Sequence, residues 1–550
     1  MLHNFLNPGF AGAVAGALWL ASALWAGEQK KFYDDDPMWR EPEPMAVESA
    51  HSRKLSDYYD FVENTFAPKG ERQSEAGRLI PARGVNTLGE APDSAWYTNR
   101  HYFHPMSTEE LARGPGDQSA PAKNGMWVIV AAKNEGVTPG FTIVDAGGRK
   151  YVLKFDPASN PEMASAADVI SSKFFYALGY NVPENYIVTF DRTRLAIGDK
   201  TTVTDSAGKK RRMTNADLTA ILDKVPVSPN GRYRAMASLY LAGQPIGPFR
   251  YHGTRRDDPN DVVPHEHRRE LRGLRVFSAW LGHDDSRAIN TLDLIALENG
   301  VPYIRHHLID FGATLGSASF EPNSPRSGNE YLFAWRPAAA KLFSLGLYAP
   351  QWQRARYPDL PSVGRFESAV FDPERWATEY PNPAFVNMNP DDAFWAAKQV
   401  MAFTDEQIAA IVGTGEYSDP AAADWVTRCL IERRDKIGKA YFEKVLPLDQ
   451  FTLEQGRLRF EDLSARLDIG RKTYRVQWSV VDNRTGRRSA LPFEDSFEAP
   501  HMDARPGTRY LVAEIIGQRP NQFVSVYLRA REGRLEIVGI ERTWNAVRKG

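Results

Sequence analysis

The chain has 550 residues, of which 42% are apolar and 25% are charged, and its formal net charge at pH 7 is -1. This composition excludes wholesale disorder, a collagen-like repeat and a coiled coil, and the balanced charge argues against a dedicated nucleic-acid binder. The single cysteine, Cys429, cannot form an intramolecular disulfide, a cysteine-based zinc site or an iron–sulfur cluster. From the length we expect roughly two to four domains.

An uncharged, apolar stretch occupies residues 10–26. We predict a cleaved export signal over residues 1–26, because Ala21-Ser22-Ala23 offers a small-x-small cleavage pattern. An uncleaved membrane anchor is the first alternative, since the stretch has marginal length for a membrane span. A buried helix in a cytoplasmic protein is the second alternative. The predicted location is therefore periplasmic or extracellular, or alternatively membrane-anchored.

The segment 27–124 is rich in Pro, Glu, Asp and Gly and lacks a clear period. We predict an extended N-terminal segment there, with a short helix near residues 49–66. Strand and helix patterns alternate over residues 125–190 and predict a first, sheet-bearing lobe. Its expected elements are a strand at 126–132, a hairpin of 141–145 and 150–155, a helix at 160–180 and a strand at 186–190.

Helical periodicity dominates residues 191–450, which we predict to be a larger lobe with insertions. Its expected elements are helices within 265–282 and 391–445, a second hairpin at 291–309 and a long connection at 317–385. The pattern changes near residue 451, after which apolar and polar residues alternate, as in Val524, Val526 and Leu528. Residues 451–550 therefore predict a separate antiparallel β domain, which we expect to offer contacts to a protein partner.

One candidate phosphate site lies in the first predicted hairpin. Lys154 ends an apolar strand, where a lysine can hold a phosphate as a point charge. The loop from Gly136 to Gly140 precedes this hairpin, and backbone N–H groups of such a loop can lie over phosphates. A surface turn with a snorkelling lysine is the plainer alternative.

Two further motifs follow the helix predicted at 265–282. Asp285 and Asn290 lie five positions apart, and Asp310-Phe311-Gly312 follows the second hairpin. An aspartate can accept the proton of an attacking hydroxyl, and carboxamide and carboxylate oxygens can bind a metal. Each motif alone is frequent by chance. Their order along the chain, with Lys154 on a strand before them and a hairpin between them, is much less frequent by chance.

On these residues the chain resembles the protein-kinase-like superfamily over roughly residues 125–445. It is most similar to the atypical branch, which includes HipA-like, phosphatidylinositol-kinase-like and secretory-pathway kinases. The resemblance implies an α+β, two-lobed protein-kinase-like fold with a β-rich N-lobe and a helical C-lobe, to which the C-terminal antiparallel β domain is added. It also implies ATP and Mg²⁺ as cofactors.

On the nucleotide side, the resemblance implies that Lys154 binds the α- and β-phosphates and that the loop bearing Gly136 and Gly140 covers them. A helix carboxylate should then pair with Lys154. Asp168, near the middle of the predicted helix, is our first choice, although its side chain is one methylene shorter than that of glutamate. Glu162, in the first turn, is the alternative, and its simpler role is to favour the helix dipole.

On the catalytic side, the resemblance implies that Asp285 is the catalytic base and that Asn290 and Asp310 bind the metal. Asp284 is a second candidate base, disfavoured because it lies one position farther from Asn290. Arg287 either contacts a phosphate or supports Asp285 in catalysis, and an ordinary structural salt bridge is an equal alternative.

These features predict an exported, kinase-like phosphotransferase that moves the γ-phosphoryl group of ATP to a hydroxyl. The acceptor stays open between a protein Ser or Thr and a small-molecule or glycan hydroxyl. A pseudokinase that serves as a binding module is the main alternative, and a nucleotidyl transferase on the same fold is another. The presence of all four principal motif residues favours an enzyme.

Overall fold

The computed structural model describes residues 30–117, 120–133, 139–204, 210–333, 350–467, 472–492, 495–501, 509–519, 521–531 and 533–544. The predicted export signal or anchor at 1–26 and Gly136 lie outside these residues. Within the described ranges, none of the helices has both the length and the hydropathy that a membrane crossing requires.

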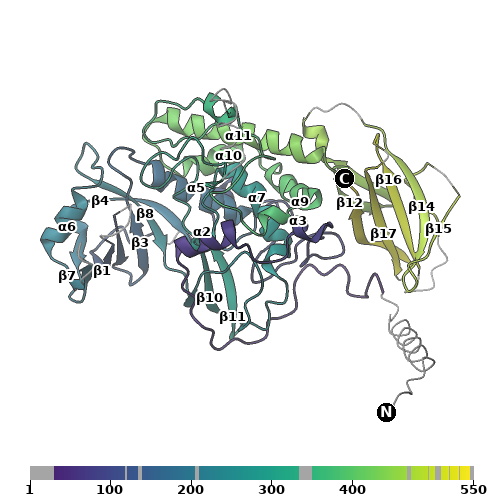
Figure 1. Cartoon of the computed structure of the whole chain (residues 1–550), viewed down its shortest axis with the longest axis horizontal. Coiled ribbons are helices and arrows are strands. Elements are labelled where there is room, and N and C mark those ends of the chain that lie inside the picture. The colour runs from purple at the N-terminus through teal and green to yellow at the C-terminus, as the bar shows by residue number, and fades with distance from the viewer. Residues whose placement is uncertain are drawn as a thin grey trace, which may run out of the picture.

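The described residues form an α+β molecule with two lobes and a C-terminal β domain, so the predicted α+β, two-lobed arrangement is confirmed (Figure 1). In Figure 1 the sheet of the first lobe lies on the left, the helices of the second lobe in the middle and the C-terminal sheet on the right. The two lobes have separate apolar clusters, one within the first sheet and one among the helices.

A six-stranded sheet forms the first lobe. Its strands are β1 (Trp127–Lys133), β2 (Gly140–Val144), β3 (Lys150–Lys154), β4 (Asn185–Phe190), β5 (Leu195–Ile197) and β8 (Tyr233–Leu239). They pair in the order β4-β8-β3-β2-β1-β5. Alternate side chains such as Ile143, Tyr151 and Leu153 are fully buried, which is why the period of two predicts β2 and β3 correctly. The sheet continues beyond residue 190, the predicted boundary between the lobes, because β5 and β8 pair into it.

A small outer layer completes this lobe. It contains η1 (Arg192–Arg194), the two-stranded sheet of β6 (Thr202–Thr204) and β7 (Lys210–Arg212), and α6 (Asn215–Leu222). The Thr214 side chain accepts a hydrogen bond from the backbone N–H of Asp217, and the Asp217 carboxylate accepts one from the Thr214 N–H, so a capping box fixes the start of α6. Leu218 and Ile221 then pack into the apolar cluster of the sheet.

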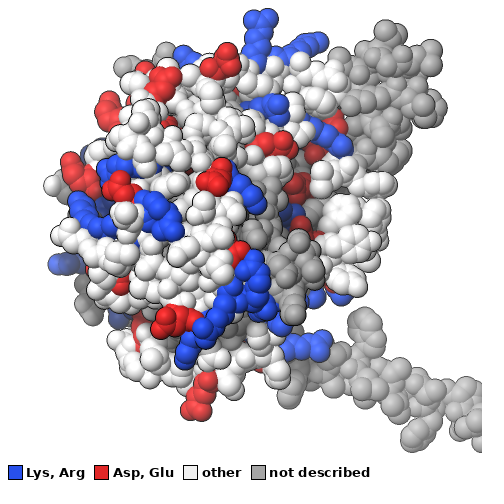
Figure 2. All heavy atoms as spheres, turned by 90° about the vertical axis from the view of Figure 1, so that its left-hand side faces the viewer, with Lys and Arg blue, Asp and Glu red and all other residues white. Residues whose placement is uncertain are grey.

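Charged side chains of both signs are interspersed over the face of this lobe seen in Figure 2. In the outer layer of this lobe, Arg211 and Asp217 form an ion pair with 2.5 Å between Nη2 and Oδ1. The mixture agrees with the net charge of -1. It leaves no large single-sign expanse on the part of this face that the structure describes.

The helix α5 (Met163–Ala177) joins the two lobes. Nearly all of its side chains are buried, because the sheet covers one side and the helices of the second lobe cover the other. Phe174, for example, packs edge-on against Trp280 with 4.8 Å between ring centroids. This two-sided burial explains why apolar residues surround the helix instead of forming a single stripe.

The second lobe is mainly helical. Its elements are β9 (Gln244–Gly247), η2 (His265–His267), α7 (Arg269–Leu281), η3 (Ala288–Asn290), β10 (Thr291–Glu298), β11 (Val301–Leu308), η4 (Gln351–Arg354), η5 (Phe385–Asn387), α9 (Pro390–Val400), α10 (Asp405–Gly413) and α11 (Pro420–Phe442). At the centre, α7 lies so close to α9 that a Cβ on Gly273 would approach the Trp395 ring to 2.6 Å. Only glycine permits this contact, so α7 and α9 pack directly against each other at the centre of the lobe.

The C-terminal domain consists of two antiparallel sheets. One pairs β12 (Leu448–Glu454) with β13 (Arg457–Asp462), after which η6 (Leu463–Leu467) follows. The other contains β14 (Arg475–Asp482), β15 (Arg488–Ala490), β16 (Arg509–Ile516), β17 (Phe523–Arg531) and β18 (Arg534–Arg542) in the order β15-β14-β16-β17-β18. Val476, Trp478 and Val526 are buried between the sheets, as the alternation of apolar and polar residues predicts.

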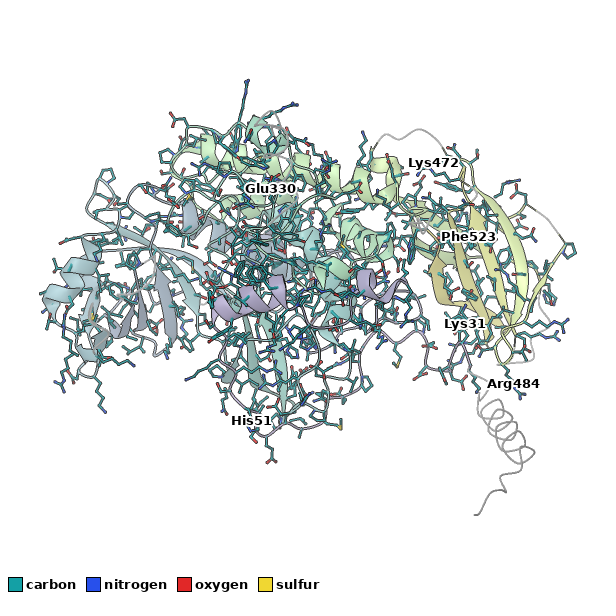
Figure 3. The ribbon with its side chains drawn as sticks, viewed as in Figure 1. Lys31, His51, Glu330, Lys472, Arg484 and Phe523 are labelled. Carbon is teal, nitrogen blue, oxygen red and sulfur yellow. The ribbon has the colours of Figure 1, made fainter. Side chains whose placement is uncertain are left out.

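The N-terminal segment lies against all parts of the molecule and is not a free linker. Figure 3 shows Lys31 beside the C-terminal sheet and His51 beneath the second lobe. The Lys31 ammonium is 2.8 Å from the Glu541 carboxylate, and Phe32 is buried among apolar residues of the C-terminal sheet. Three short helices follow: α2 (Asp57–Phe66), α3 (Gln73–Ala76) and α4 (Thr108–Arg113).

The helix predicted near residues 49–66 begins only at Asp57. The preceding residues are extended, because their backbones bond to the second lobe. The Val47 N–H donates to the carbonyl of Pro302 at 2.7 Å, and the Arg53 N–H donates to that of Ile246 at 2.8 Å. Tertiary hydrogen bonds therefore override the helical pattern of this stretch.

A buried charge cluster joins the N-terminal segment and the helical lobe to the C-terminal domain. Lys398 of α9 contacts the carboxylates of Glu90 and Asp449, and the latter lies 2.7 Å from the Lys398 ammonium. Arg542 of β18 donates to the other oxygen of Asp449 at 2.8 Å. Burial would raise the pKa of Asp449, but the Lys398 and Arg542 charges outweigh it and lower the pKa to about 2. The carboxylate thus stays charged and ties β12 to both cations.

Candidate active site

A cavity of about 490 Å³ opens between the sheet of the first lobe and the start of α5. Its walls come from β1, β2, β3 and β8 on the sheet side and from residues 310–319 on the side of the second lobe. The lining residues are Ala131, Ala132, Pro139, Gly140, Phe141, Thr142, Val152, Leu153, Lys154, Phe155, Ala164, Ser165, Asp168, Met236, Asp310, Gly312 and Ser319. A cavity of this size, lined by apolar residues together with a few polar and charged groups, is typical of a small-ligand site.

Lys154 stands at the charged end of the cavity between two carboxylates, which we call the cavity cluster (Lys154, Asp168 and Asp310). Its ammonium nitrogen lies 3.2 Å from Asp168 Oδ2 and 2.7 Å from Asp310 Oδ1. Burial opposes the charge on Lys154, but the two carboxylates outweigh it and raise its pKa above the ordinary lysine value. The lysine is therefore held as a cation that faces the cavity.

The sheet and α5 bring these groups together. Lys154 is the last residue of β3 and pairs with Gly140 of β2 and Met236 of β8. Asp168 lies in the middle of α5 with only 2% of its surface exposed. The side-chain amide of Asn185, at the start of β4, donates to Asp168 Oδ1 at 2.8 Å, which leaves Oδ2 for Lys154.

The helix carboxylate that contacts Lys154 is thus Asp168, and Glu162 lies elsewhere. Glu162 precedes α5 with a positive φ of 70°, and its carboxylate accepts a hydrogen bond from the Ser418 N–H at 2.8 Å. It joins the start of α5 to the segment before α11. Burial raises the pKa of Asp168, although the neighbouring Lys154 charge opposes the increase.

Asp310 is fixed by the burial of the residue that follows it. The Phe311 ring is fully buried and stacks on Phe175 of α5, with 5.0 Å between centroids. Asp310 itself has a φ of 62°, an uncommon conformation for a residue with a side chain, and its carboxylate is 49% exposed. The strained turn therefore aims a partly open carboxylate at Lys154.

Gly140 lines the cavity at the start of β2. A Cβ at this position would lie 2.6 Å from the Leu153 carbonyl oxygen, so the close approach of β2 to β3 itself demands glycine. Its role in covering phosphates stays a prediction, and Gly136 lies outside the described residues.

Asn290 lies at the base of the β10–β11 hairpin, next to the residue before Asp310. The carbonyl of Asn290 accepts a hydrogen bond from the Ile309 N–H at 3.0 Å. Its side-chain amide nitrogen donates to the Asp285 carbonyl at 2.8 Å, and this bond orders the loop between the two residues. The hairpin thereby joins the loop that carries Asp285 to the turn that carries Asp310.

Of the two predicted metal ligands, Asp310 lines the cavity and Asn290 is not among its lining residues. Asp310 and Asn290 offer carboxylate and carboxamide oxygens, and Mg²⁺ usually takes one or two such ligands together with phosphate oxygens and water. Within the described residues, no group of three or more His, Cys, Asp or Glu side chains could hold a metal ion. A closed protein cage for the ion is therefore not what this part of the chain provides.

Asp285 and Arg287 belong to a second group of charges, the loop cluster (Asp57, Asp285, Arg287 and Glu379). The Arg287 guanidinium contacts the Asp285 carboxylate and lies 2.8 Å from Asp57 Oδ1 and 3.0 Å from Glu379 Oε2. None of these residues is among those that line the cavity. Arg287 thus forms a carboxylate-sharing ion pair in this structure.

The excess of carboxylates in this region shifts their protonation. Burial raises the pKa of Asp285 to about 7, an increase that the Arg287 charge opposes and the Glu379 charge reinforces. Burial and the Glu379 charge also raise the pKa of Asp284 to about 7, against hydrogen bonds from Ser327 and Asn323. A carboxyl group with a pKa near neutrality can exchange a proton at physiological pH.

Sequence analysis missed three residues that complete these clusters. Asn185 orients Asp168, while Asp57 and Glu379 bind Arg287. Asp57 lies in the segment expected to be mostly extended, and Glu379 lies in the long connection at 317–385. Neither has a spacing relation to Asp285, so no local pattern could have indicated them.

Comparison with known proteins gives distant structural neighbours. No family model and no curated protein sequence matches the chain. Among solved structures, the Helicobacter pylori proinflammatory kinase CtkA is similar at 12% identity and a TM-score of 0.31, over 58% of this chain and 95% of that one. The Golgi casein kinase is similar at 10% identity and a TM-score of 0.30, over 73% of this chain and 96% of that one. The same kinase with Mn/ADP bound has the same identity, TM-score and coverage of this chain, and 94% of its own chain is covered. Because identity and TM-score are low, we argue the site from its own contacts.

Proposed function

We propose that this protein is a phosphotransferase that binds ATP with a divalent cation in the cavity and moves the γ-phosphoryl group to a hydroxyl acceptor. The observation that carries the proposal is the cavity cluster: Lys154 lies within 3.2 Å of both Asp168 and Asp310 at the charged end of a cavity of about 490 Å³. A held lysine and a half-exposed carboxylate in a cavity that also has apolar walls suit a ligand with an apolar base and a charged tail.

Charge balance supports a metal–phosphate ligand. The cavity cluster contains one cation and two carboxylates, so its formal charge is negative and it would repel a bare triphosphate. A divalent cation bound by Asp310 and Asn290 reverses that sign and supplies charge to the phosphates. Lys154 then binds phosphate oxygens as a point charge, while Asp168 and Asn185 keep its side chain in place.

The transfer step needs a group that takes the proton of the acceptor hydroxyl, and we assign this role to Asp285. The hydroxyl oxygen forms a bond to the γ-phosphorus, the bond from that phosphorus to the β–γ bridging oxygen breaks, and ADP leaves. The hydroxyl proton passes to the Asp285 carboxylate. A pKa of about 7 for Asp285 suits this exchange, and Asn290 holds the Asp285 backbone.

We keep three finer features as proposals. The acceptor is a protein Ser or Thr or a small-molecule hydroxyl, and the chain is exported or membrane-anchored through residues 1–26. The C-terminal domain would supply contacts to a partner. The first experiment below needs neither the acceptor nor the location to be known.

Calorimetric titration of the full chain with ATP tests the nucleotide site. The titration is run with Mg²⁺, with Mn²⁺ and with a chelator, on wild type, Asp310→Ala and the control Asp424→Ala, which changes an exposed aspartate of α11. We expect wild type and the control to bind ATP only with a divalent cation. Asp310→Ala should weaken that binding by at least about tenfold, because it removes a metal ligand.

The products of ATP then distinguish the rival functions. ADP release that depends on Asp285 supports phosphotransfer, whereas AMP and pyrophosphate release indicates nucleotidyl transfer. Metal-dependent binding without any turnover favours the binding-module alternative. A folded wild-type chain that binds no ATP under any of these conditions overturns the proposal.

A further inference from the structure

The helix α2 of the N-terminal segment packs against the loop that carries Asp285. Asp57, at its first position, lies 2.8 Å from Arg287, two residues after Asp285. Asp60, one turn later, accepts a hydrogen bond from the Tyr380 hydroxyl at 2.7 Å. Two carboxylates of one helix therefore hold Arg287 of the loop and Tyr380, the residue after Glu379.

The contact made by Asp60 is buried and specific. Asp60 has 6% of its surface exposed, and the side-chain amide of Asn64 donates to its carboxylate at 3.1 Å and to its carbonyl at 2.9 Å. By contrast, Tyr58 and Tyr59 point away from the loop and are largely exposed. The buried residues of α2 are thus the polar Asp60 and Asn64, and the half-buried Phe61 packs against the Tyr380 ring.

Arg287 is shared among carboxylates from three separate stretches of chain. Asp57 comes from the N-terminal segment, Asp285 from the loop itself and Glu379 from the long connection. One guanidinium has five N–H donors in a fixed plane and can satisfy several carboxylates at once. Its position, and with it the direction of the Asp285 carboxylate, depends on all three partners.

We propose that α2 braces the catalytic loop and that Asp57 is a positioning residue for phosphotransfer, acting through Arg287 on Asp285. The inference rests on the proposed function, since Asp285 is the proton acceptor there. It adds a requirement for a helix that lies more than two hundred positions earlier in the chain. The N-terminal segment is then a working part of the active site.

This role differs from a contribution to overall stability. The Asp57 carboxylate is 52% exposed, and half-exposed ion pairs contribute only about 0–1 kcal/mol to folding. Loss of Asp57 should leave the fold and the cavity unchanged while it releases one side of Arg287. The rate of phosphotransfer should then fall without a matching loss of ATP binding.

The test compares Asp57→Asn, Asp57→Glu and the control Glu48→Gln in the full chain. Glu48 is an exposed carboxylate of the same segment, so the control removes the same charge away from the loop. We expect Asp57→Asn to lower kcat about tenfold, as removal of a hydrogen bond to a charged group does, with KM for ATP within about twofold. Asp57→Glu should recover most of the rate, and the control should match wild type.

Amide hydrogen exchange provides a readout that needs no catalysis. In Asp57→Asn, exchange should speed up in residues 283–290 and stay unchanged in residues 150–170, which belong to the cavity side. Equal kcat and equal exchange in Asp57→Asn and wild type overturn the inference. A rise in KM for ATP as large as the fall in kcat also overturns the inference, because the helix would then act on the cavity.

The two proposals fail in different ways. If wild type binds no ATP, the proposed function is wrong, and the catalytic role of Asp57 falls with it. The exchange measurement still decides whether α2 braces the loop. If wild type is active and Asp57→Asn is as active as the control Glu48→Gln, the proposed function stands. This inference alone is then wrong.

Discussion

The cavity cluster and the loop cluster are built from the same kinds of groups in different proportions. In the first, Lys154 is shared by two carboxylates beside an open cavity. In the second, Arg287 is shared by three carboxylates, and Asp284 lies next to them in the chain. The first keeps a lysine charged, and the second raises the pKa of two aspartates to about 7.

The difference shows how excess negative charge is put to two uses. Where a carboxylate is half-exposed, as Asp310 is, a cation from solution can reach it, and this is where we propose that the metal binds. Where the carboxylates are buried or mostly buried, as Asp284 and Asp285 are, the excess raises their pKa and favours a bound proton. A phosphotransferase needs both: a site for a metal and its phosphates, and a group that exchanges a proton.

The largest effect is expected when the cavity cluster loses its cation. We expect Lys154→Met to lower phosphotransfer by roughly 100-fold or more, because two carboxylates then face the phosphates without compensation. The matched control is Lys444→Met, which removes a half-exposed lysine whose ammonium lies 2.8 Å from Glu374. Single-turnover assays compare the two, and thermal unfolding confirms that both remain folded.

The control also separates a phosphate contact from a simple salt bridge. If Lys154→Met and Lys444→Met lose equally little activity, Lys154 only stabilises the lobe, and the assignment of phosphate binding is wrong. A loss that is confined to Lys154→Met places the effect at the cavity.

Much of the cavity cluster could be predicted from the sequence because its parts lie on regular local elements. A period of two fixes β3 and hence Lys154, a helical pattern fixes α5 and hence Asp168, and a hairpin precedes Asp310. The pairing of Lys154 with Asp168, at 3.2 Å, follows from packing one helix on one sheet. Such packing involves elements that are close together in the chain.

The loop cluster could be predicted only in part. Asp285 and Asn290 belong to a motif with a fixed spacing, whereas Asp57 and Glu379 contact Arg287 from distant segments. The same limit applies to β8, which inserts between β3 and β4 although it follows them in the chain by many residues. Long-range pairing leaves no period in the sequence, and it depends on surfaces that exist only after folding.

A smaller effect is expected at the residue that orients Asp168. Asn185→Leu removes the hydrogen bond of 2.8 Å to Asp168 Oδ1 while it keeps a side chain of similar size in a buried position. Asp168 can then rotate, and Lys154 is held less well. We expect KM for ATP to rise about tenfold with a smaller change in kcat, which initial-rate kinetics measures. A change in kcat alone would show that Asn185 acts on the loop cluster instead.

The smallest effect is a change in how stability depends on pH. Asp284 has a pKa of about 7 in the folded protein, above its ordinary value of about 3.9 in an unfolded chain. Between these values the folded state binds more protons than the unfolded state, so stability falls as pH rises from about 4 to about 7. Asp284→Asn removes one titrating group and should flatten part of this slope.

Urea unfolding at about pH 5 and about pH 8 checks this sign. Relative to wild type, Asp284→Asn should gain stability at the higher pH, where wild type must bury a charged carboxylate near Glu379. At the lower pH the two should be closer, since Asp284 is then protonated in the folded wild type. Asp285 keeps its own raised pKa in the variant, so the remaining slope should be reduced and not abolished. Parallel plots of stability against pH for the two proteins would mean that the pKa of Asp284 is not raised in the folded protein. The contrast with the cavity cluster would then rest on Asp285 alone.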